Sequence, residues 1–284
     1  MSFLGAKSIF DQTLQDLYIE DESERKSVAF LLLEDGFGIS KMDIILNKSV
    51  MIDELLLEEY VERINRQEPI QQIVGFTYFA SRKFKVDKNV LIPRPETEEL
   101  ISIIKSLQLD QPAILDIGTG SGCLAISLAL ELINSEVWAL DISEGALKVA
   151  MENAKSLKAS VKFLHEDILK EKSTEVNLKR FDLIVSNPPY IRNLEKSQMK
   201  ANVIDYEPHL ALFVENDNPL IFYKRIADLG IEQLNKDGLI LAEINSYLGE
   251  ETRQLFEKKG YEQVEILKDF YGKDRFVKAK KGLV

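Results

Sequence analysis

The strongest constraint on the fold is a regular alternation of apolar and amphipathic segments that begins after Pro112. Short, continuously apolar segments predict strands at 113–117, 136–140, 161–165, 181–186 and 238–244. Apolar residues at helical spacing predict helices between them at 123–133, 144–157 and 219–234. A closing hairpin with antiparallel character is expected at 264–267 and 275–278. Strands that alternate with helices predict a doubly wound, Rossmann-like α/β sheet covered by helices on both faces.

The part of the chain before Pro112 has a different pattern. Residues 1–72 are predicted to be helical, because apolar side chains recur there at spacings of three and four residues. Aromatic residues within 73–92 predict a short β-hairpin. A helix is expected from Thr97 to Leu107, with Thr97 as its cap. A length of 284 residues also fits one large domain with a smaller one beside it.

The charge balance limits the partners that the chain can have. With 47 Asp and Glu against 36 Lys and Arg, the net charge is −11, which is poorly suited to binding long nucleic acids as a whole. Residues 1–72 alone hold 15 acidic and 7 basic residues. We expect this acidic surface to be solvated, and a docking face for a basic protein is the alternative.

Few residues are available for metal or disulfide chemistry. Cys123 is the only cysteine, and His165 and His209 are the only histidines, so neither an intramolecular disulfide nor a metal site is predicted. No apolar run reaches the roughly 18 residues that cross a bilayer. The first seven residues lack the order of a secretion signal, and a cytoplasmic protein is expected.

A glycine-rich turn lies between the first predicted strand of the sheet and its helix. Residues 116–122 read Asp-Ile-Gly-Thr-Gly-Ser-Gly, and glycine lets a ligand approach the backbone closely. We expect free amides of the helix N-terminus to face the cleft. The spacing differs from the dinucleotide pattern G-x-G-x-x-G, which argues against NAD. The residues predicted to hold a cofactor are Gly118, Thr119, Gly120, Ser121 and Gly122.

Two acidic residues follow the next strands. Asp141 ends the second strand, where a carboxylate can accept hydrogen bonds from both hydroxyls of a ribose. Asp167, followed by Ile168, ends the third strand, within reach of an adenine amino group. Helix capping is the alternative role for either acid. Together with the glycine turn they resemble the S-adenosylmethionine site of class I methyltransferases.

The fourth strand leads directly into Asn187-Pro188-Pro189-Tyr190. An amide or aromatic amine nitrogen is a poor nucleophile, because its lone pair is delocalised. The Asn187 side-chain oxygen and the Pro188 carbonyl can each accept one N–H bond, which directs the lone pair at a methyl group. Tyr190 offers a flat surface against the planar group. The loop predicts methylation of a planar NH₂ nitrogen.

The chain resembles the HemK/PrmC family, the glutamine-N5 methyltransferases of peptide chain release factors. The resemblance runs over roughly residues 60 to 280. It is carried most specifically by Leu-Ile-Pro-Arg-Pro-Glu-Thr-Glu at 91–98, with 116–125 and 186–191. Further matching positions are Glu68-Pro69, Gly75, Glu207-Pro208, Ala211-Leu212-Phe213 and the segment from Asp269 to Val277.

This resemblance implies an activity and a set of site residues. It implies methyl transfer from S-adenosyl-L-methionine to the glutamine of the Gly-Gly-Gln motif in class I release factors, with S-adenosyl-L-homocysteine as the product. Asn187, Pro188 and Tyr190 would be catalytic, and Pro189 would complete the glutamine pocket. Asp141, Asp167, Ile168 and Asn187 would join the glycine turn in binding the cofactor. The implied organisation is a helical substrate-docking domain at 1–72, a hairpin linker at 73–92 and a catalytic domain at 93–284.

Three points stay open on the sequence alone. Arg94, Glu96 and Thr97 either order the cleft near the methionine end of the cofactor or brace the domain junction. The Asn-Pro-Pro-Tyr loop also occurs in enzymes that methylate adenine or cytosine amino groups in nucleic acid, and this is the alternative activity. A cofactor-binding scaffold without catalysis is the second alternative.

Overall fold

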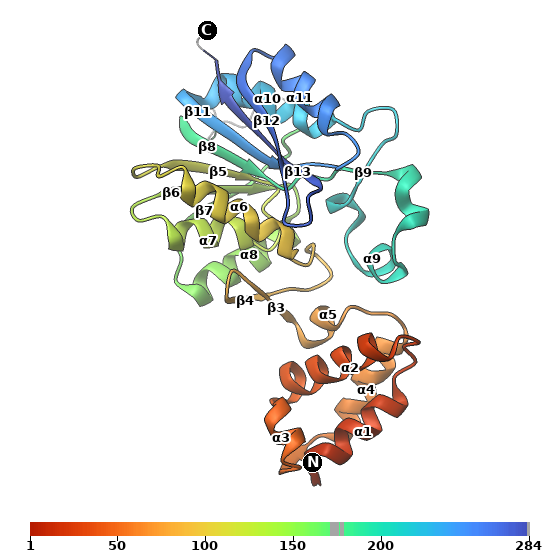
Figure 1. Ribbon diagram of the computed structural model, residues 1–284. Helices are drawn as coiled ribbons and strands as arrows, with labels where there is room; N and C mark the ends of the chain where they lie inside the picture. The colour runs from red at the N-terminus through yellow and green to blue at the C-terminus, as the bar shows by residue number, and fades with distance from the viewer. Residues whose placement is uncertain (171–175, 177–178, 283–284) are drawn as a thin grey trace. The chain divides into compact units, whose positions relative to one another are not determined.

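The computed structural model describes residues 1–170, 176 and 179–282, and it divides into two compact units (Figure 1). The helical unit comprises Met1–Phe76 and Lys200–Tyr206. The α/β unit comprises Thr77–Met199 and Glu207–Val284. The two-unit division therefore splits the predicted linker at 73–92, and it assigns Lys200–Tyr206 to the helical unit although the sequence placed it in the catalytic domain.

The helical unit is built from five helices and one short strand pair within residues 1–76. Its helices are α1 (Ala6–Asp16), α2 (Glu22–Leu31), α3 (Lys41–Ile45), α4 (Glu54–Asn65) and α5 (Ile70–Val74). A π-helical turn at Leu32–Gly36 extends α2. Strands β1 (Ser2–Gly5) and β2 (Ser49–Ile52) pair antiparallel, which the sequence did not predict. The helix α9 (Ala201–Tyr206) joins this unit, and the Tyr206 hydroxyl donates to the Arg66 carbonyl at 2.7 Å.

Several acidic residues of the helical unit have a structural task. The carboxylates of Asp21 and Asp53 accept hydrogen bonds from backbone amides at the N-termini of α2 and α4. Ser40 and Asp43 form a reciprocal capping box at the start of α3. Acidic caps satisfy amides that have no partner inside the helix. Part of the negative charge of residues 1–72 therefore fixes where these helices begin.

The α/β unit contains a seven-stranded sheet in the order β12-β13-β11-β8-β5-β6-β7. Its strands are β5 (Ala113–Ile117), β6 (Glu136–Asp141), β7 (Val161–His165), β8 (Phe181–Ser186), β11 (Leu234–Glu243), β12 (Tyr261–Lys268) and β13 (Asp274–Lys281). The strands from β11 to β7 run parallel, and β13 pairs antiparallel with both of its neighbours. The predicted Rossmann-like sheet and its antiparallel closing hairpin are confirmed.

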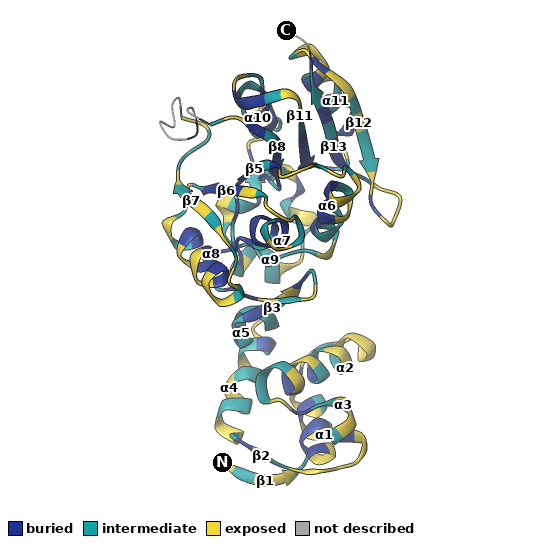
Figure 2. Cartoon of the chain, turned by 90° about the vertical axis from the view of Figure 1, so that its left-hand side faces the viewer, coloured by how far each residue is buried: buried dark blue, intermediate teal, exposed yellow. Residues whose placement is uncertain are grey.

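Helices cover both faces of this sheet (Figure 1). One face holds α6 (Pro95–Ser106), α7 (Cys123–Glu131) and α8 (Glu144–Leu157), and the other holds α10 (Ile221–Gln233) and α11 (Gly249–Lys258). Alternate residues of one strand belong to two separate cores: Ile114 packs with α6 and α7, whereas Leu115 packs with α10. Figure 2 shows buried residues along the central strands and exposed ones on the outer turns of α8. The α11 helix was not predicted.

Two smaller features complete the α/β unit. Strands β3 (Phe76–Phe79) and β4 (Arg82–Lys85) form the predicted hairpin, whose turn residues Ala80 and Ser81 both have positive φ, as type I′ turns require. The segment between β8 and α10 holds short elements: β9 (Ile191–Arg192), 3₁₀ turns at Asn193–Gln198 and His209–Ala211, and β10 (Phe213–Val214). No helix in the described part of the chain is both long and apolar enough to span a bilayer.

Candidate active site

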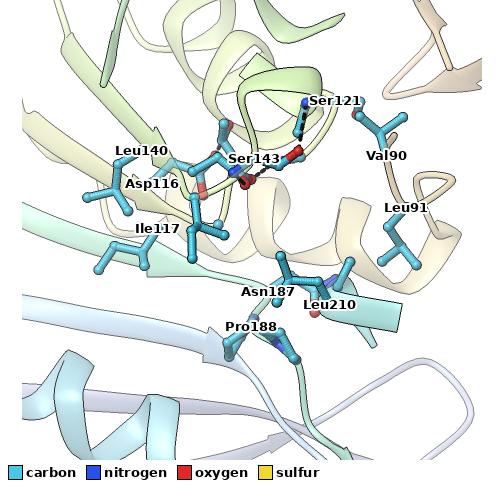
Figure 3. A pocket seen from close by; sticks show the side chains of 18 of the residues that line it. Val90, Leu91, Asp116, Ile117, Ser121, Leu140, Ser143, Asn187, Pro188 and Leu210 are labelled. Atoms are coloured by element: carbon cyan, nitrogen blue, oxygen red, sulfur yellow. Dashed lines mark hydrogen bonds between the residues drawn. The ribbon is translucent and has the colours of Figure 1, made fainter. Parts of the chain in front are cut away.

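The candidate site is a cavity of about 230 Å³ at the carboxyl ends of β5, β6, β7 and β8. Parallel α/β sheets bind ligands at this edge, because the loops that follow each strand converge there. Figure 3 shows Asn187 and Pro188 on one side of the cavity, with Ser121 and Ser143 on the side opposite. The predicted site residues that line it are Gly118, Thr119, Gly120, Ser121, Asp141, Asp167, Ile168, Asn187, Pro188 and Pro189.

The glycines of the turn after β5 have two different roles. Gly118 and Gly120 have φ of 74° and 55°, and no atom lies within 4 Å of the position that a Cβ would take. Their faces toward the cavity are therefore open to a ligand. At Gly122 a Cβ would lie 3.1 Å from the Ala150 Cβ and 2.9 Å from the Ile126 Cδ1. Gly122 does not line the cavity, and its lack of a side chain lets α7 pack closely against α8.

Three amides of the turn, those of Gly118, Thr119 and Gly120, are paired with the end of β6. Gly118 and Thr119 donate to the Leu140 carbonyl at 2.9 and 3.0 Å. The Gly120 amide donates to Oδ2 of Asp141 at 2.9 Å, and Oδ1 of Asp141 accepts from the Ser143 amide at 2.9 Å. These bonds attach the turn to the end of β6, because two strand ends that lie side by side can satisfy each other's polar groups. The first part of the turn thus presents open glycine positions and carboxylates toward the cavity.

Carboxyl groups dominate the polar lining. Asp116, Asp141, Glu166 and Asp167 line the cavity, and Arg94 is the only Lys or Arg among the described residues that do so. Asp116 is buried and accepts a hydrogen bond from the Thr119 hydroxyl at 2.7 Å. Burial raises the pKa of Asp116 to about 7 and also raises the pKa of Asp141. A cationic ligand would be attracted here, whereas the pyrophosphate of a dinucleotide would be repelled.

Arg94 has a defined partner within the α/β unit. Its Nη2 lies 2.5 Å from Oε1 of Glu207, and Oε2 of Glu207 accepts from the Ile92 amide at 3.0 Å. The Glu207 side chain is buried, so this ion pair is shielded from water on its acidic side. The pair holds the Pro-Arg-Pro segment against Glu207-Pro208 and forms one wall of the cavity.

Thr97 is not a helix cap, which corrects the prediction. The helix α6 begins at Pro95, because a proline suits the first helical position, and Thr97 lies inside the first turn. Its side chain is buried and its hydroxyl donates to Oε2 of Glu243 at 2.7 Å. The Thr97 oxygen also accepts a hydrogen bond from Nδ2 of Asn187 at 3.1 Å. Thr97 therefore contacts the loop that begins at Asn187 directly.

Tyr190 also differs from its predicted place. It is not among the residues that line the cavity, and its ring packs against the core on the α10 face of the sheet. Its hydroxyl donates to Oε1 of Glu243 at 2.8 Å. Burial raises the pKa of Tyr190 well above its usual range, so the hydroxyl stays protonated.

Thr97 and Tyr190 both bond to Glu243, which the sequence pattern did not single out as a site residue. It is 2% exposed at the end of β11, beside Ser186 of β8, since Ala242 pairs with Ser186. The signal was present: Glu243 is an acid at the carboxyl end of a central strand, as Asp141 is.

The sequence matches known methyltransferases. Residues 96–207 match the family described as the methyltransferase small domain. The release factor glutamine methyltransferase of Flavobacterium psychrophilum is 43% identical over 95% of this chain and 95% of that protein. The enzyme of the same name from Bacteroides thetaiotaomicron is 42% identical over 94% of this chain and 96% of that protein. A methyltransferase structure from Pyrococcus furiosus has the same fold, with a TM-score of 0.53 at 18% identity over 78% of this chain and 98% of that one.

Proposed function

From the premise that the chain belongs to the family of release factor glutamine methyltransferases, we propose that it methylates the side-chain amide nitrogen (N5) of the glutamine in the Gly-Gly-Gln motif of class I peptide chain release factors. The observation that carries the proposal is the position of Asn187 and Pro188. Both line the acidic cavity formed by the glycine turn, so an amide acceptor and a cationic methyl donor can meet there.

The donor-binding residues fit S-adenosyl-L-methionine, which the family implies. The open faces of Gly118 and Gly120 leave room for the methionine part, Asp141 ends β6 where ribose hydroxyls can bind, and Asp167 with Ile168 can border the adenine. The carboxylates of the lining suit a positive charge. When bound, S-adenosyl-L-methionine supplies a methyl group on a cationic sulfur, and S-adenosyl-L-homocysteine is the product.

The contribution of the chain to the reaction is orientation. The side-chain oxygen of Asn187 and the carbonyl of Pro188 would each accept one N–H of the glutamine amide, which leaves the lone pair of the nitrogen directed at the methyl group. Proline at 188 and 189 stiffens this loop and removes two competing backbone donors. No strong base is needed before attack, because positive charge moves from sulfur to nitrogen and the surplus proton can then leave to water.

We infer that the helical unit docks the release factor. Phe3 of β1 lies directly opposite Met51 of β2, and residues paired in this way project to the same face of a sheet. The two side chains are 72% and 57% exposed, so together they form an open apolar pair on the surface of this unit. Acidic residues outnumber basic ones about two to one in residues 1–72, so a basic protein surface would be attracted. The proposed docking surface therefore combines an exposed apolar pair, Phe3 and Met51, with the net negative charge of the helical unit.

The test, for an enzyme that we infer to act in the cytoplasm, is methyl transfer from labelled S-adenosyl-L-methionine to a purified class I release factor. The release factor should be labelled, and the same factor with its Gly-Gly-Gln glutamine replaced should not. DNA and RNA incubated in parallel should stay unlabelled, in keeping with the net charge of −11. Label that survives the glutamine replacement, or that enters nucleic acid at a matching rate, would reject the proposed acceptor.

A further inference from the structure

The two ends of the Asn187 side-chain amide are chemically opposite, and methyl transfer needs one of them. Its oxygen can accept an N–H of the substrate amide, whereas its NH₂ group would point a donor at a donor. Turning the amide by half a rotation exchanges the two with little change of shape. Something in the protein must therefore decide which end faces the cavity.

The partner of Asn187 is a hydroxyl whose direction is already fixed. Nδ2 of Asn187 lies 3.1 Å from Oγ1 of Thr97, and Oγ1 of Thr97 lies 2.7 Å from Oε2 of Glu243. A hydroxyl has one proton to donate, and an ionised carboxylate can only accept. The Thr97 proton is thus committed to Glu243. The Thr97 oxygen can therefore only accept a hydrogen bond from Asn187. Because the NH₂ group is the donor end of the amide, this end of Asn187 faces Thr97 and the oxygen faces away.

Glu243 is in turn held from its other side. Its Oε1 accepts from the Tyr190 hydroxyl at 2.8 Å, so each carboxylate oxygen has its own donor. Nη1 of Arg275 lies 4.0 Å from the same Oε1, and Nε of Arg275 is bound to Asp269 at 3.0 Å. Burial raises the pKa of Glu243, and its bonds from Thr97 and Tyr190 together with the charge of Arg275 oppose that rise. Two hydroxyl donors and a nearby guanidinium favour the ionised, accepting form.

We propose that Glu243, acting through Thr97, fixes the orientation of the Asn187 amide so that its oxygen faces the glutamine nitrogen. Thr97 and Glu243 are positioning residues, and this role rests on the proposed function. This proposal gives Thr97 a role within the Pro-Arg-Pro-Glu-Thr-Glu segment, because its hydroxyl contacts Asn187 of the Asn-Pro-Pro-Tyr loop. It also explains why an acid is buried at the end of β11 and shared by residues 97 and 190.

The reversed arrangement is disfavoured at two places. With Asn187 turned, its oxygen would face Oγ1 of Thr97, an acceptor against an acceptor. Thr97 could relieve this contact only by donating to Asn187, and Oε2 of the buried Glu243 would then lose its donor. A buried charged oxygen without a partner is among the costliest defects in a protein interior. The chain of bonds therefore has one satisfied state.

The test compares three variants. Thr97→Val removes the hydroxyl but keeps the shape, and we expect kcat for release factor methylation to fall roughly 10- to 100-fold while KM for the release factor changes less than about threefold. Thr97→Ser restores a hydroxyl and should rescue most of kcat. Thr252→Val is the matched control: Thr252 is also buried in the α/β unit, but its hydroxyl bonds to the Leu248 carbonyl of its own helix. It should keep wild-type kcat.

Two further readouts separate positioning from general damage. In a double-mutant cycle, Thr97→Val should lower the residual activity of Asn187→Ala by less than about twofold, because the residue through which Thr97 acts is already gone. In ¹⁵N-labelled protein without ligands, the Asn187 NH₂ resonance, assigned by its loss in Asn187→Ala, should move in Thr97→Val and stay in place in Thr252→Val. If Thr97→Val fails to fold, Thr97→Ala, a good helix former, takes its place with the same expectations.

The outcomes are distinguishable. Wild-type protein that labels the release factor, together with a Thr97→Val variant whose kcat lies within about threefold of wild type, overturns the positioning role and leaves the proposed function standing. The positioning role is also overturned if Thr97→Val lowers the activity of Asn187→Ala by the same factor as it lowers that of the wild type. Wild-type protein that labels no release factor overturns the proposed function, and the positioning role falls with it.

Discussion

Replacing Asp116 with asparagine should change how the stability of the protein depends on pH. Asp116 is 2% exposed at the end of β5, and burial raises the pKa of its carboxyl from 3.8 to about 7. The folded protein therefore holds a proton that the unfolded chain releases. The free energy of unfolding is therefore highest, as far as Asp116 is concerned, below about pH 4. It falls as the pH rises toward 7, because over that range Asp116 ionises in the unfolded chain but stays protonated in the folded protein.

The size of the effect follows from the shift. A rise of about 3 pKa units corresponds to a loss of roughly 4 kcal/mol in the free energy of unfolding between about pH 4 and pH 7. The side-chain amide of the Asp116→Asn variant does not titrate, so the variant lacks this decline. The variant carries a constant cost for its altered hydrogen bonds with Thr119, about 1 to 3 kcal/mol at any pH. Its stability relative to wild type should therefore improve by roughly 4 kcal/mol from about pH 4 to about pH 8.

Urea unfolding measures this directly. Trp138 is the only tryptophan, and it is buried in β6 next to β5, so its fluorescence reports on the α/β unit that contains Asp116. Unfolding free energies are compared at several pH values and constant ionic strength. The matched control is Asp237→Asn: Asp237 is exposed and its hydrogen bond with Lys280 lowers its pKa, so its contribution has the opposite sign. A difference between Asp116→Asn and wild type that stays constant across pH would show that Asp116 does not titrate with a raised pKa in the folded protein.

Four further variants test the donor site, the acceptor site and the docking face. Asn187→Ala should keep binding of S-adenosyl-L-methionine by calorimetry and lower kcat by about 100-fold or more, and normal turnover would contradict the mechanism. Gly118→Ala adds a methyl group to the cavity lining and should weaken donor binding. Both Gly118→Ala and Gly122→Ala are strained by a positive φ, but Gly122→Ala also clashes with Ala150 of α8 and should lower Tm more; equal effects of the two on both readouts would contradict the separate roles. Phe3→Ser with Met51→Ser should raise KM for the release factor roughly tenfold without changing the affinity for the donor, and an unchanged KM would exclude docking at this face.

Much of the α/β unit is readable from the sequence because the information is local. An apolar strand, a glycine turn and an amphipathic helix can each be recognised from about 20 residues of sequence. Asp141 and Asp167 can be placed at the cavity because each follows a predicted strand. The same applies to the hairpin at 76–85, which its aromatic residues indicate, although Ala80 and Ser81 are unusual residues for the positive φ of its turn.

The misses come from contacts between distant parts of the chain. Thr97 resembles a helix cap because of its place before an apolar run, but Pro95 starts the helix earlier and Thr97 bonds to Glu243, which lies 146 residues away. Tyr190 resembles a stacking platform, yet its hydroxyl turns toward the same carboxylate. Gly122 looks like its neighbours in the turn, and only α8 reveals its packing role. No local pattern encodes these pairings.

Glutamine methylation is tested most directly by fragment mass analysis of a release factor after incubation with this protein and S-adenosyl-L-methionine. We expect one added methyl group on the peptide that contains Gly-Gly-Gln, assigned by fragmentation to the glutamine side chain, and no such gain with Asn187→Ala. A methyl group on any other residue, or an unmodified release factor in the presence of active, donor-binding protein, would contradict it.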